Sequence, residues 1–433
     1  MKINLSGWGR FPTVQSKPFF LKDSTSLAQT IAHNFRGIAF GMGRSYGDSA
    51  LSEEVVLTHT YNHFLDFDSE RGLLRVQAGT TLKEMLEVIV PKGWFLPVTP
   101  GTQFVTFGGA IACDIHGQNH HKEGSFCDHV NWYRLMLPSG EIVTCSPTQN
   151  PELFHATNGG MGLTGIILEG ELRLKPIQSA FIDMTTIKAR NLDEILALFD
   201  EHIGFTYSVA WIDTLARGKH IGRSVLLLGE HSADGGLLLP ESSEKSLPIE
   251  FPDFVLNSTS VALFNTLYYN KNFHKQSQTR VPYRPYFYPL DAVLHWNKMY
   301  GRRGFTQYQF VIPKSERATL SKILDEIAKA KRASFLAVLK LFGKENENWL
   351  SFPKEGYTLA LDFPIRDGIF ELLKRLDKLV LDAGGRLYLT KDATMSKEMF
   401  QAGYPNWQKF VELRCAIGAD KVFSSLQSER LGL

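Results

Sequence analysis

The segment from Pro100 to Val130 constrains this chain more than any other, because seventeen of its residues, 101–117, hold four glycines around His116, with a His-His pair just beyond. It reads PGTQFVTFGGAIACDIHGQNHHKEGSFCDHV, with glycines at positions 101, 108, 109 and 117 around His116. Glycine adopts positive φ and lets a ligand lie against the main chain, although a misplaced glycine destabilises a fold by roughly 0.5–1 kcal/mol. The segment therefore predicts a cofactor-binding loop, with a tight turn around core histidines as the alternative.

A second glycine-rich run lies upstream, at residues 37–48 (GIAFGMGRSYGD). It begins as a short apolar strand and ends as a polar loop, a pattern that delivers backbone N–H groups to an anion. The spacing Gly-x-Gly-x-x-x-Gly differs from the dinucleotide fingerprint, and no amphipathic helix follows it. The Walker pattern is excluded because Gly-Lys-Ser/Thr is missing. The run predicts a phosphate-binding loop of another architecture.

Hydrophobic periodicity predicts a mixed α+β chain. Residues 73–78 read as a strand, and Thr81 with Glu84 forms a capping box that starts a helix ending at Pro91. Further helices are expected at residues 192–199 and 320–330, and further strands at 207–212, 225–228, 307–312, 335–342 and 357–363. Residues 229–250 carry two prolines and five acids, and we expect a mobile surface loop there.

Composition excludes several classes of protein. The 433 residues exceed one ordinary core and predict two domains, and a net charge of +2 gives no reason to expect nucleic acid binding. No run reaches the ~20 apolar residues of a membrane span, and the start has no signal-peptide core, so we expect a cytoplasmic protein. The four cysteines (Cys113, Cys127, Cys145 and Cys415) form no Cys-x-x-Cys pair, and reduced thiols are expected.

Several of these segments carry a family resemblance. Residues 41–48, 100–102, 108–117 and 162–167 resemble the FAD-binding segments of the vanillyl-alcohol-oxidase (PCMH-type) flavoprotein superfamily. Residues 7–10, 307–313, 340–343, 362–365 and 385–392 extend the likeness, within that superfamily, to the oxidase subunits of decaprenylphosphoryl-β-D-ribose 2'-epimerases. The resemblance covers nearly the whole chain.

The resemblance implies a division of the chain and an activity. It implies a PCMH-type FAD-binding domain of two α+β subdomains, formed by residues 1–179 and 386–433, and an inserted substrate domain at 180–385 with an antiparallel sheet flanked by helices. The implied reaction is oxidation of the 2'-hydroxyl of a polyprenylphosphoryl ribose to a keto intermediate, completed by an NAD(P)H-dependent short-chain reductase. Peripheral association with the inner face of a membrane follows from such a lipid substrate. The alternative is an oxidase of the same fold that acts on a soluble sugar, alditol or aldonolactone.

The expected FAD contacts come from the glycine-rich segments. They are Gly41, Gly43, Arg44, Ser45, Tyr46, Gly47, Asp48, Gly101, Thr106, Phe107, Gly108, Gly109, Cys113, His116, Gly117, Ile167 and Tyr388. Arg44 occupies the position where covalently flavinylated relatives often carry a histidine. Arginine cannot form that bond, so we expect FAD to be held non-covalently.

Flavin-dependent alcohol oxidation needs a proton acceptor beside the flavin. Lys391 follows an apolar pair where burial would lower its pKa toward that of a useful base, while a solvated lysine beside Asp392 is the alternative. The resemblance favours Lys391 as the catalytic residue, supported by His116, whose role the sequence leaves open. Substrate contacts are expected from Gln307, Gln309, Lys340, Thr358 and Lys391, with surface polar alternation as the competing account.

Two other features carry hypotheses. Residues 254–290 contain no Asp or Glu, and their four cationic residues lie among aromatic residues in the sequence. This combination is suited to binding a phosphate attached to an apolar chain. The four cationic residues are Lys271, Lys275, Arg280 and Arg284. A zinc site can be drawn from six other residues, but their spacing matches no known zinc motif and leaves both glycine loops unexplained (Cys113, His116, His120, His121, Cys127, His129). We therefore expect no metal.

Overall fold

The computed structural model describes residues 2–239, 245–247, 250–252 and 256–433. The first part of the chain forms two sheets. One has the order β1 (Ile3–Ser6), β2 (Thr13–Phe20), β4 (Glu54–Leu57) and β3 (Ile38–Phe40). The other is antiparallel, with the order β5 (Phe64–Asp68), β6 (Leu73–Gln77), β10 (Ile166–Arg173), β8 (Val130–Met136) and β9 (Ile142–Cys145). β7 (Trp94–Phe95) and β11 (Lys175–Pro176) form a small antiparallel pair beside them.

The helices of this part are short. They are α1 (Ser24–Ala32), α2 (Leu82–Ile89), α3 (Phe107–Ala112), α4 (His120–Glu123) and α5 (Pro151–Thr157). α2 begins with the predicted capping box, because the Thr81 side chain accepts from the Glu84 N–H and Glu84 accepts from the Thr81 N–H. The buried side chains of α2 repeat at helical spacing and pack against the five-stranded sheet in one apolar core.

The middle of the chain forms an eight-stranded antiparallel sheet. Its order is β16 (Gln276–Pro282), β12 (Phe181–Ala189), β14 (Ser224–His231), β13 (Tyr207–Ile212), β19 (Ala337–Phe342), β20 (Gly356–Pro364), β18 (Phe305–Ile312) and β21 (Arg386–Leu387). The helices that accompany it are α6 (Leu192–Glu201), α7 (Ser258–Asn270), α8 (Tyr283–Phe287), α9 (Arg317–Lys329) and α10 (Ile369–Asp382). β15 (Lys245–Ser246) pairs in parallel with β17 (Val293–Leu294) outside this sheet.

The two faces of the large sheet differ in chemistry. Ala210, Leu339, Leu359 and Phe310 are cross-strand neighbours on one face, and they share an apolar core with residues of α6, α9 and α10. Successive strand residues point to opposite faces. The other face therefore carries the adjacent cross-strand row of Trp211, Val338, Ala360 and Gln309. Gln309, the polar residue of this row, contacts His116 of the first part of the chain.

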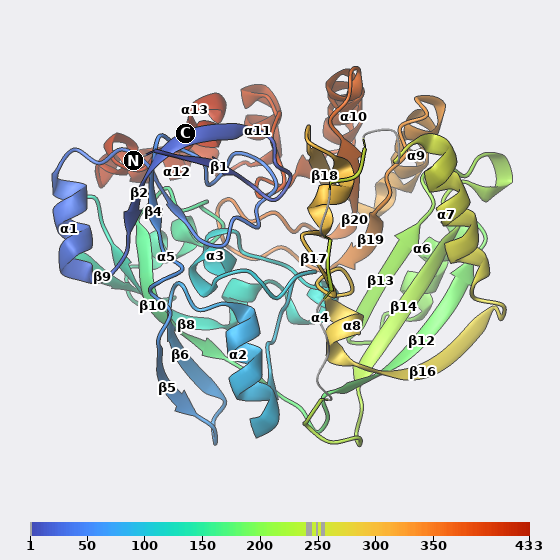
Figure 1. The fold of residues 1–433 in the computed structure, drawn as a ribbon, viewed down its shortest axis with the longest axis horizontal. Coiled ribbons are helices and arrows are strands. Elements are labelled where there is room, and N and C mark those ends of the chain that lie inside the picture. The colour runs from blue at the N-terminus through green and yellow to red at the C-terminus, as the bar shows by residue number, and fades with distance from the viewer. Residues whose placement is uncertain (1, 240–244, 248–249, 253–255) are drawn as a thin grey trace.

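The C-terminal segment returns to the first part of the chain. α11 (Lys397–Gly403), α12 (Trp407–Ala416) and α13 (Leu426–Leu431) lie over the β1–β4 side of the molecule (Figure 1). Phe423 forms a bridge with Gly37, and the Ser424 N–H donates to the Gly37 carbonyl at 2.9 Å. Contact between the C-terminal segment and the first part of the chain is what a two-part FAD domain implies. β21, however, hydrogen-bonds to β18 of the large sheet. The domain bounds themselves stay a prediction.

The α+β fold class is confirmed, and the expected helices and strands are present within a few residues of their predicted ends. The predicted loop at residues 229–250 starts too early, because Gly229 pairs with both Tyr207 and Met184 and β14 continues to His231. Residues 240–244 and 248–249 of that loop lie outside the described part. All four cysteines are free thiols. Within the described ranges, no helix has the length and apolar character needed to cross a bilayer.

Candidate active site

The glycine-rich loop at residues 41–48 contacts the C-terminal segment through its backbone. The Tyr46 N–H donates to the Thr390 carbonyl at 3.0 Å, and the Trp8 N–H donates to the Ser45 carbonyl at 2.7 Å. A Cβ on Gly47 would lie 1.5 Å from the Asp392 carbonyl oxygen, so only glycine permits this approach. The loop and the segment that carries Lys391 are therefore held together.

Ionic contacts reinforce the same junction. Arg430 of α13 donates to Asp48 at 2.8 Å and to Asp392 at 2.8 Å. Both carboxylates are buried, and burial raises the pKa of Asp48 while the Arg430 guanidinium opposes that shift. Asp48, predicted as a cofactor contact, is thus used to anchor the loop. No sequence pattern pointed to Arg430, because 382 residues separate it from Asp48.

Several backbone N–H groups of this loop have no acceptor among the described residues. The N–H groups of Gly43, Arg44, Ser45 and Gly47 donate to no acceptor in the described part of the chain. Arg44 lies with its guanidinium carbon 3.9 Å from the Trp8 ring centre and 4.9 Å from that of Phe104. Its Nε is buried without a partner among the described residues, and burial lowers its pKa. Unused donors beside a cation are suited to an anionic ligand.

The second glycine-rich segment lies against the first. Thr106 caps α3 by accepting from the Gly109 N–H at 3.1 Å, and its hydroxyl oxygen would lie 2.7 Å from a Cβ on Gly41. A Cβ on Gly108 would meet Ala78 at 2.9 Å, so this glycine is needed for packing. Gly101, by contrast, is exposed and has no atom within 4 Å of its Cβ position.

Lys391 lies at the centre of the junction. Its Nζ is 3.8 Å from the centre of the buried Tyr46 ring. Burial lowers the Lys391 pKa to about 7, the nearby Asp362 carboxylate opposes that shift, and the Lys340 ammonium adds to it. Burial likewise lowers the Lys340 pKa to about 8. A lysine whose amine is partly unprotonated near neutral pH is suited to accept a proton.

Asp362 belongs to the same cluster, and sequence reasoning missed it as a site residue. Gln307 donates to its Oδ1 at 2.5 Å, and the Tyr300 hydroxyl donates to its Oδ2 at 3.3 Å. It is fully buried, and burial raises its pKa to about 7, while the Gln307 hydrogen bond and the Lys391 charge oppose that rise. A signal was present in the sequence, because Asp362 interrupts an apolar strand at a position opposite Gln307.

His116 contacts the large sheet directly. Its Nε2 accepts from the Gln309 amide nitrogen at 3.0 Å, and the same nitrogen lies 3.2 Å from the Thr358 hydroxyl. Burial and the Lys340 charge hold the His116 pKa well below its usual range, so the ring is neutral. Its Nδ1 is buried and has no partner in the described part of the chain. With Nε2 as acceptor, Nδ1 carries the proton and is available to donate.

Aromatic rings enclose His116. The rings of Phe342, Phe352 and Tyr388 lie within 4.8, 5.5 and 5.1 Å of its centre. The Tyr388 hydroxyl donates to the Cys113 carbonyl at 3.1 Å, so Cys113 contributes its backbone here. These contacts fix the imidazole between the glycine-rich segment and β19–β20.

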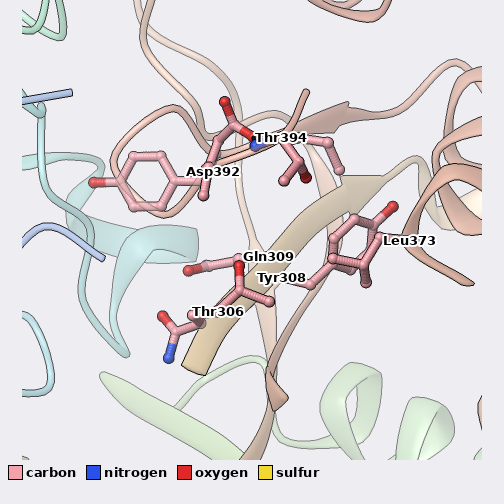
Figure 2. Close-up of a pocket in the computed structure, with 10 residues that line it drawn as sticks. Thr306, Tyr308, Gln309, Leu373, Asp392 and Thr394 are labelled. Atoms are coloured by element: carbon pink, nitrogen blue, oxygen red, sulfur yellow. Dashed lines mark hydrogen bonds between the residues drawn. The ribbon is translucent and has the colours of Figure 1, made fainter. Parts of the chain in front are cut away.

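Figure 2 shows part of this region, with Gln309 directed away from the side of β18 on which Tyr308 and Leu373 lie. Gln307 and Gln309 share the face that Trp211, Val338 and Ala360 occupy. Lys340 lies opposite Thr358 on that same face. The five predicted substrate residues therefore lie on or beside one surface, together with His116.

Three other predicted residues are buried in the first part of the chain. Ile167 and Phe107 are buried in the core of the first part of the chain. Gly117 is closed in by Asn119 and Thr99, whose atoms would lie 2.6 and 2.9 Å from a Cβ. None of these positions contradicts a backbone contact with a cofactor, and their roles stay predictions.

The cations of residues 254–290 do not converge on this site. Arg280 pairs with Asp183 at 2.7 Å and also contacts Asp234, and Lys275 pairs with Glu194 at 3.4 Å. Asp183, Asp234 and Glu194 lie outside residues 254–290, so the count of acids in that stretch did not include them. Among the described residues, the six side chains of the zinc hypothesis do not form a group of three potential metal ligands.

Comparisons with known proteins add independent information. A model of the FAD binding domain family matches residues 24–146. The chain is 35% identical to decaprenylphosphoryl-beta-D-ribose oxidase of Mycolicibacterium smegmatis, over 99% of this chain and 97% of that protein. It is 32% identical to an uncharacterized protein of Streptomyces coelicolor, over 82% of this chain and 100% of that protein. Delta(24)-sterol reductase of Homo sapiens is 30% identical over 31% of this chain and 26% of that protein.

Proposed function

This chain belongs to the decaprenylphosphoryl-β-D-ribose oxidase family of FAD-dependent oxidoreductases, and from that premise we propose that it oxidises the 2'-hydroxyl of a polyprenylphosphoryl ribose to a ketone. The observation that carries the proposal is the position of Lys391. Its amine, with a pKa lowered to about 7, lies between the glycine-rich loop, the Tyr46 ring and the amide-lined face of the large sheet.

The residues present fit FAD. The unused N–H groups of the loop at residues 41–48 provide donors for a pyrophosphate, and Arg44 adds positive charge. The open position at Gly101 leaves the main chain accessible there. The His116 Nδ1–H, buried without a protein partner in the described ranges, can donate to a flavin or sugar oxygen. We propose that these groups hold FAD without a covalent bond.

Oxidation of a secondary alcohol removes a hydride from carbon and a proton from oxygen. FAD, when bound, accepts the hydride. We assign the proton to the neutral amine of Lys391, because its pKa is lowered to about 7 and its Nζ lies beside the Tyr46 ring of the glycine-rich loop. Each turnover thus converts a CH–OH group to a C=O group, with the proton on Lys391 and two electrons on the cofactor.

Burial lowers the Lys391 pKa most, and the charges of Asp362 and Lys340 adjust it further. The Asp362 carboxylate stabilises the Lys391 ammonium, whereas the Lys340 charge destabilises it. Gln307 and Tyr300 orient Asp362 through hydrogen bonds to its two oxygens. We propose that Asp362 is a positioning residue that tunes the base, and that it does not itself take the substrate proton.

The remaining polar groups on the sheet face are suited to a pentose. Gln309, Thr358 and Lys340 offer an amide, a hydroxyl and an ammonium from adjacent strands. We propose that they bind the sugar hydroxyls and that Lys340 lies near the phosphate. We also propose a separate NAD(P)H-dependent reductase that reduces the ketone, and peripheral association with a membrane that supplies the lipid.

The experiment that tests this function uses the FAD-loaded protein without oxygen. A polyprenylphosphoryl ribose is expected to bleach the visible flavin spectrum, and free ribose, an alditol and an aldonolactone are expected to leave it unchanged. Bleaching by the free sugars at comparable concentrations, with no response to the lipid, would overturn the substrate assignment and support a soluble-sugar oxidase.

A further inference from the structure

Helix α7 has an unusual composition for a helix on the surface. Its thirteen residues, Ser258–Asn270, contain no charged side chain. Leu263 and Leu267 lie one turn apart and are 61% and 62% exposed, and Phe273 just beyond the helix is 92% exposed. Large apolar side chains gathered on one exposed face mark an interaction surface. We call Leu263, Leu267 and Phe273 the apolar edge.

The opposite side of α7 is firmly attached to the large sheet. Asn265 is buried and donates to Asp213 at 2.7 Å. Tyr268 packs on Trp211 with ring centres 4.8 Å apart, and Phe264 packs on Phe335 at 4.6 Å. The helix therefore presents the apolar edge outward from a fixed position, and Figure 1 shows it on the side of the molecule away from β1–β4.

The position of α7 connects this edge to the proposed active site. Trp211, Val338, Ala360 and Gln309 are successive cross-strand neighbours on one face of the sheet. With strands about 4.8 Å apart, three strand spacings put Trp211 about 14 Å from Gln309. Apart from Gln309, the row consists of apolar side chains. An apolar surface thus leads from the amides of the site to the helix.

Two lysines contact aromatic side chains of α7. Lys271 lies with its Nζ 3.9 Å from the Tyr268 ring centre, and Lys188 lies 4.3 Å from that of Tyr269. Neither lysine pairs with a carboxylate in the described part of the chain. Two described acids next to α7 are paired with cations: Asp213 with Arg223, and Glu194 with Arg190 and Lys275. Exposed leucine and phenylalanine with flanking lysines suit an anionic lipid surface.

We propose that the apolar edge of α7, with Lys271 and Lys188, docks the protein on an anionic membrane, so that a lipid substrate passes from the bilayer along the Trp211–Val338–Ala360 row to Gln309. This rests on the proposed function for the identity of the substrate. We favour a membrane over a protein partner for two reasons. The apolar edge lies near two lysines that pair with no described carboxylate. Its own three side chains carry no hydrogen-bond acceptor or carboxylate that would select a particular protein.

The test is flotation of the FAD-loaded protein with phosphatidylcholine vesicles that contain phosphatidylglycerol. The wild type is expected to float with these vesicles and less with pure phosphatidylcholine. The triple variant Leu263→Ser, Leu267→Ser, Phe273→Ser is expected to lose binding on the order of tenfold. Leu238→Ser removes a leucine that is 77% exposed elsewhere and is expected to bind as the wild type does. Lys271→Gln is expected to weaken binding only to the anionic vesicles.

A second readout separates the docking surface from the function. A short-chain, water-soluble prenylphosphoryl ribose is expected to bleach the flavin of the triple variant as fast as that of the wild type, which also shows that the variant is folded. Vesicle binding unchanged in the triple variant would overturn the docking proposal and leave the edge for a protein partner. Vesicle binding that depends on the edge, without any bleaching by the lipid sugar, would support the surface and overturn the proposed function.

Discussion

The Lys391 ammonium nitrogen lies 3.8 Å from the centre of the Tyr46 ring, which joins the C-terminal segment to the glycine-rich loop near the start of the chain. Lys391 is half-buried beside the buried Tyr46 ring, and burial lowers its pKa to about 7. The same contact places the proposed base beside the proposed cofactor loop. The predictions below depend on this relationship.

Replacing Lys391 with methionine keeps the length of the side chain and removes the amine. The rate constant of flavin bleaching by the lipid sugar is expected to fall roughly 10²–10⁴-fold, the usual contribution of a general base. The flavin spectrum should persist, because FAD is held by other groups. Lys344→Met, at a surface position outside the cluster, is the control. A rate constant for Lys391→Met within twofold of the wild-type value would remove Lys391 from the mechanism.

The pH dependence of flavin bleaching follows from the same amine. Burial lowers the Lys391 pKa to about 7, so the rate constant should rise with pH through about 7 and then level off as the neutral amine becomes predominant. The Asp362 carboxylate raises that pKa, so Asp362→Asn should move the rising limb to lower pH. The measurement is the anaerobic rate constant at saturating substrate over pH 5–9.

Asp377 offers a matched control for that experiment. It is a half-buried carboxyl of α10, on the helix-covered face of the sheet. Burial raises its pKa to about 6, and the hydrogen bond from the Tyr308 hydroxyl, at 2.9 Å, opposes that rise. Asp377→Asn should leave the rising limb in place. Equal shifts of the pH profile in the Asp362→Asn and Asp377→Asn variants would show that the rise in rate constant reflects a general effect on the fold.

Non-covalent FAD is a separate prediction. Arg44 stands where a tethering histidine would be, and its guanidinium lies between the Trp8 and Phe104 rings. Acid precipitation of the yellow protein should therefore release all of its flavin into the supernatant. Flavin that stays in the precipitate and comigrates with the denatured chain would contradict this.

Two glycines should respond differently to alanine. Gly47→Ala forces a Cβ against the Asp392 carbonyl and should lower the free energy of unfolding of the FAD-free protein by about 1–3 kcal/mol. Gly101→Ala meets no protein atom within 4 Å, so it should unfold as the wild type does and yet bind FAD less tightly. Thermal unfolding and FAD titration measure the two effects. Unchanged FAD affinity in Gly101→Ala would remove Gly101 from the cofactor site.

Local patterns predicted much of this structure. The Thr81–Glu84 capping box and the alternation of Gln307 and Gln309 depend on residues close in sequence, and both are present as expected. Asp362 and Arg430 were missed because their roles depend on contacts with residues 55 and 382 positions away. Arg280 was misjudged for the same reason, since its partner Asp183 lies on the neighbouring strand β12.

The most direct test of the central claim is a deuterium isotope effect on flavin bleaching. A polyprenylphosphoryl ribose with deuterium on the carbon that bears the 2'-hydroxyl should bleach the flavin of the anaerobic wild type more slowly than the unlabelled lipid, because that C–H bond breaks. Deuterium at the 3' carbon should have no such effect. Equal rates for the 2'-labelled and unlabelled lipids, with the label retained in the product, would contradict oxidation at this position.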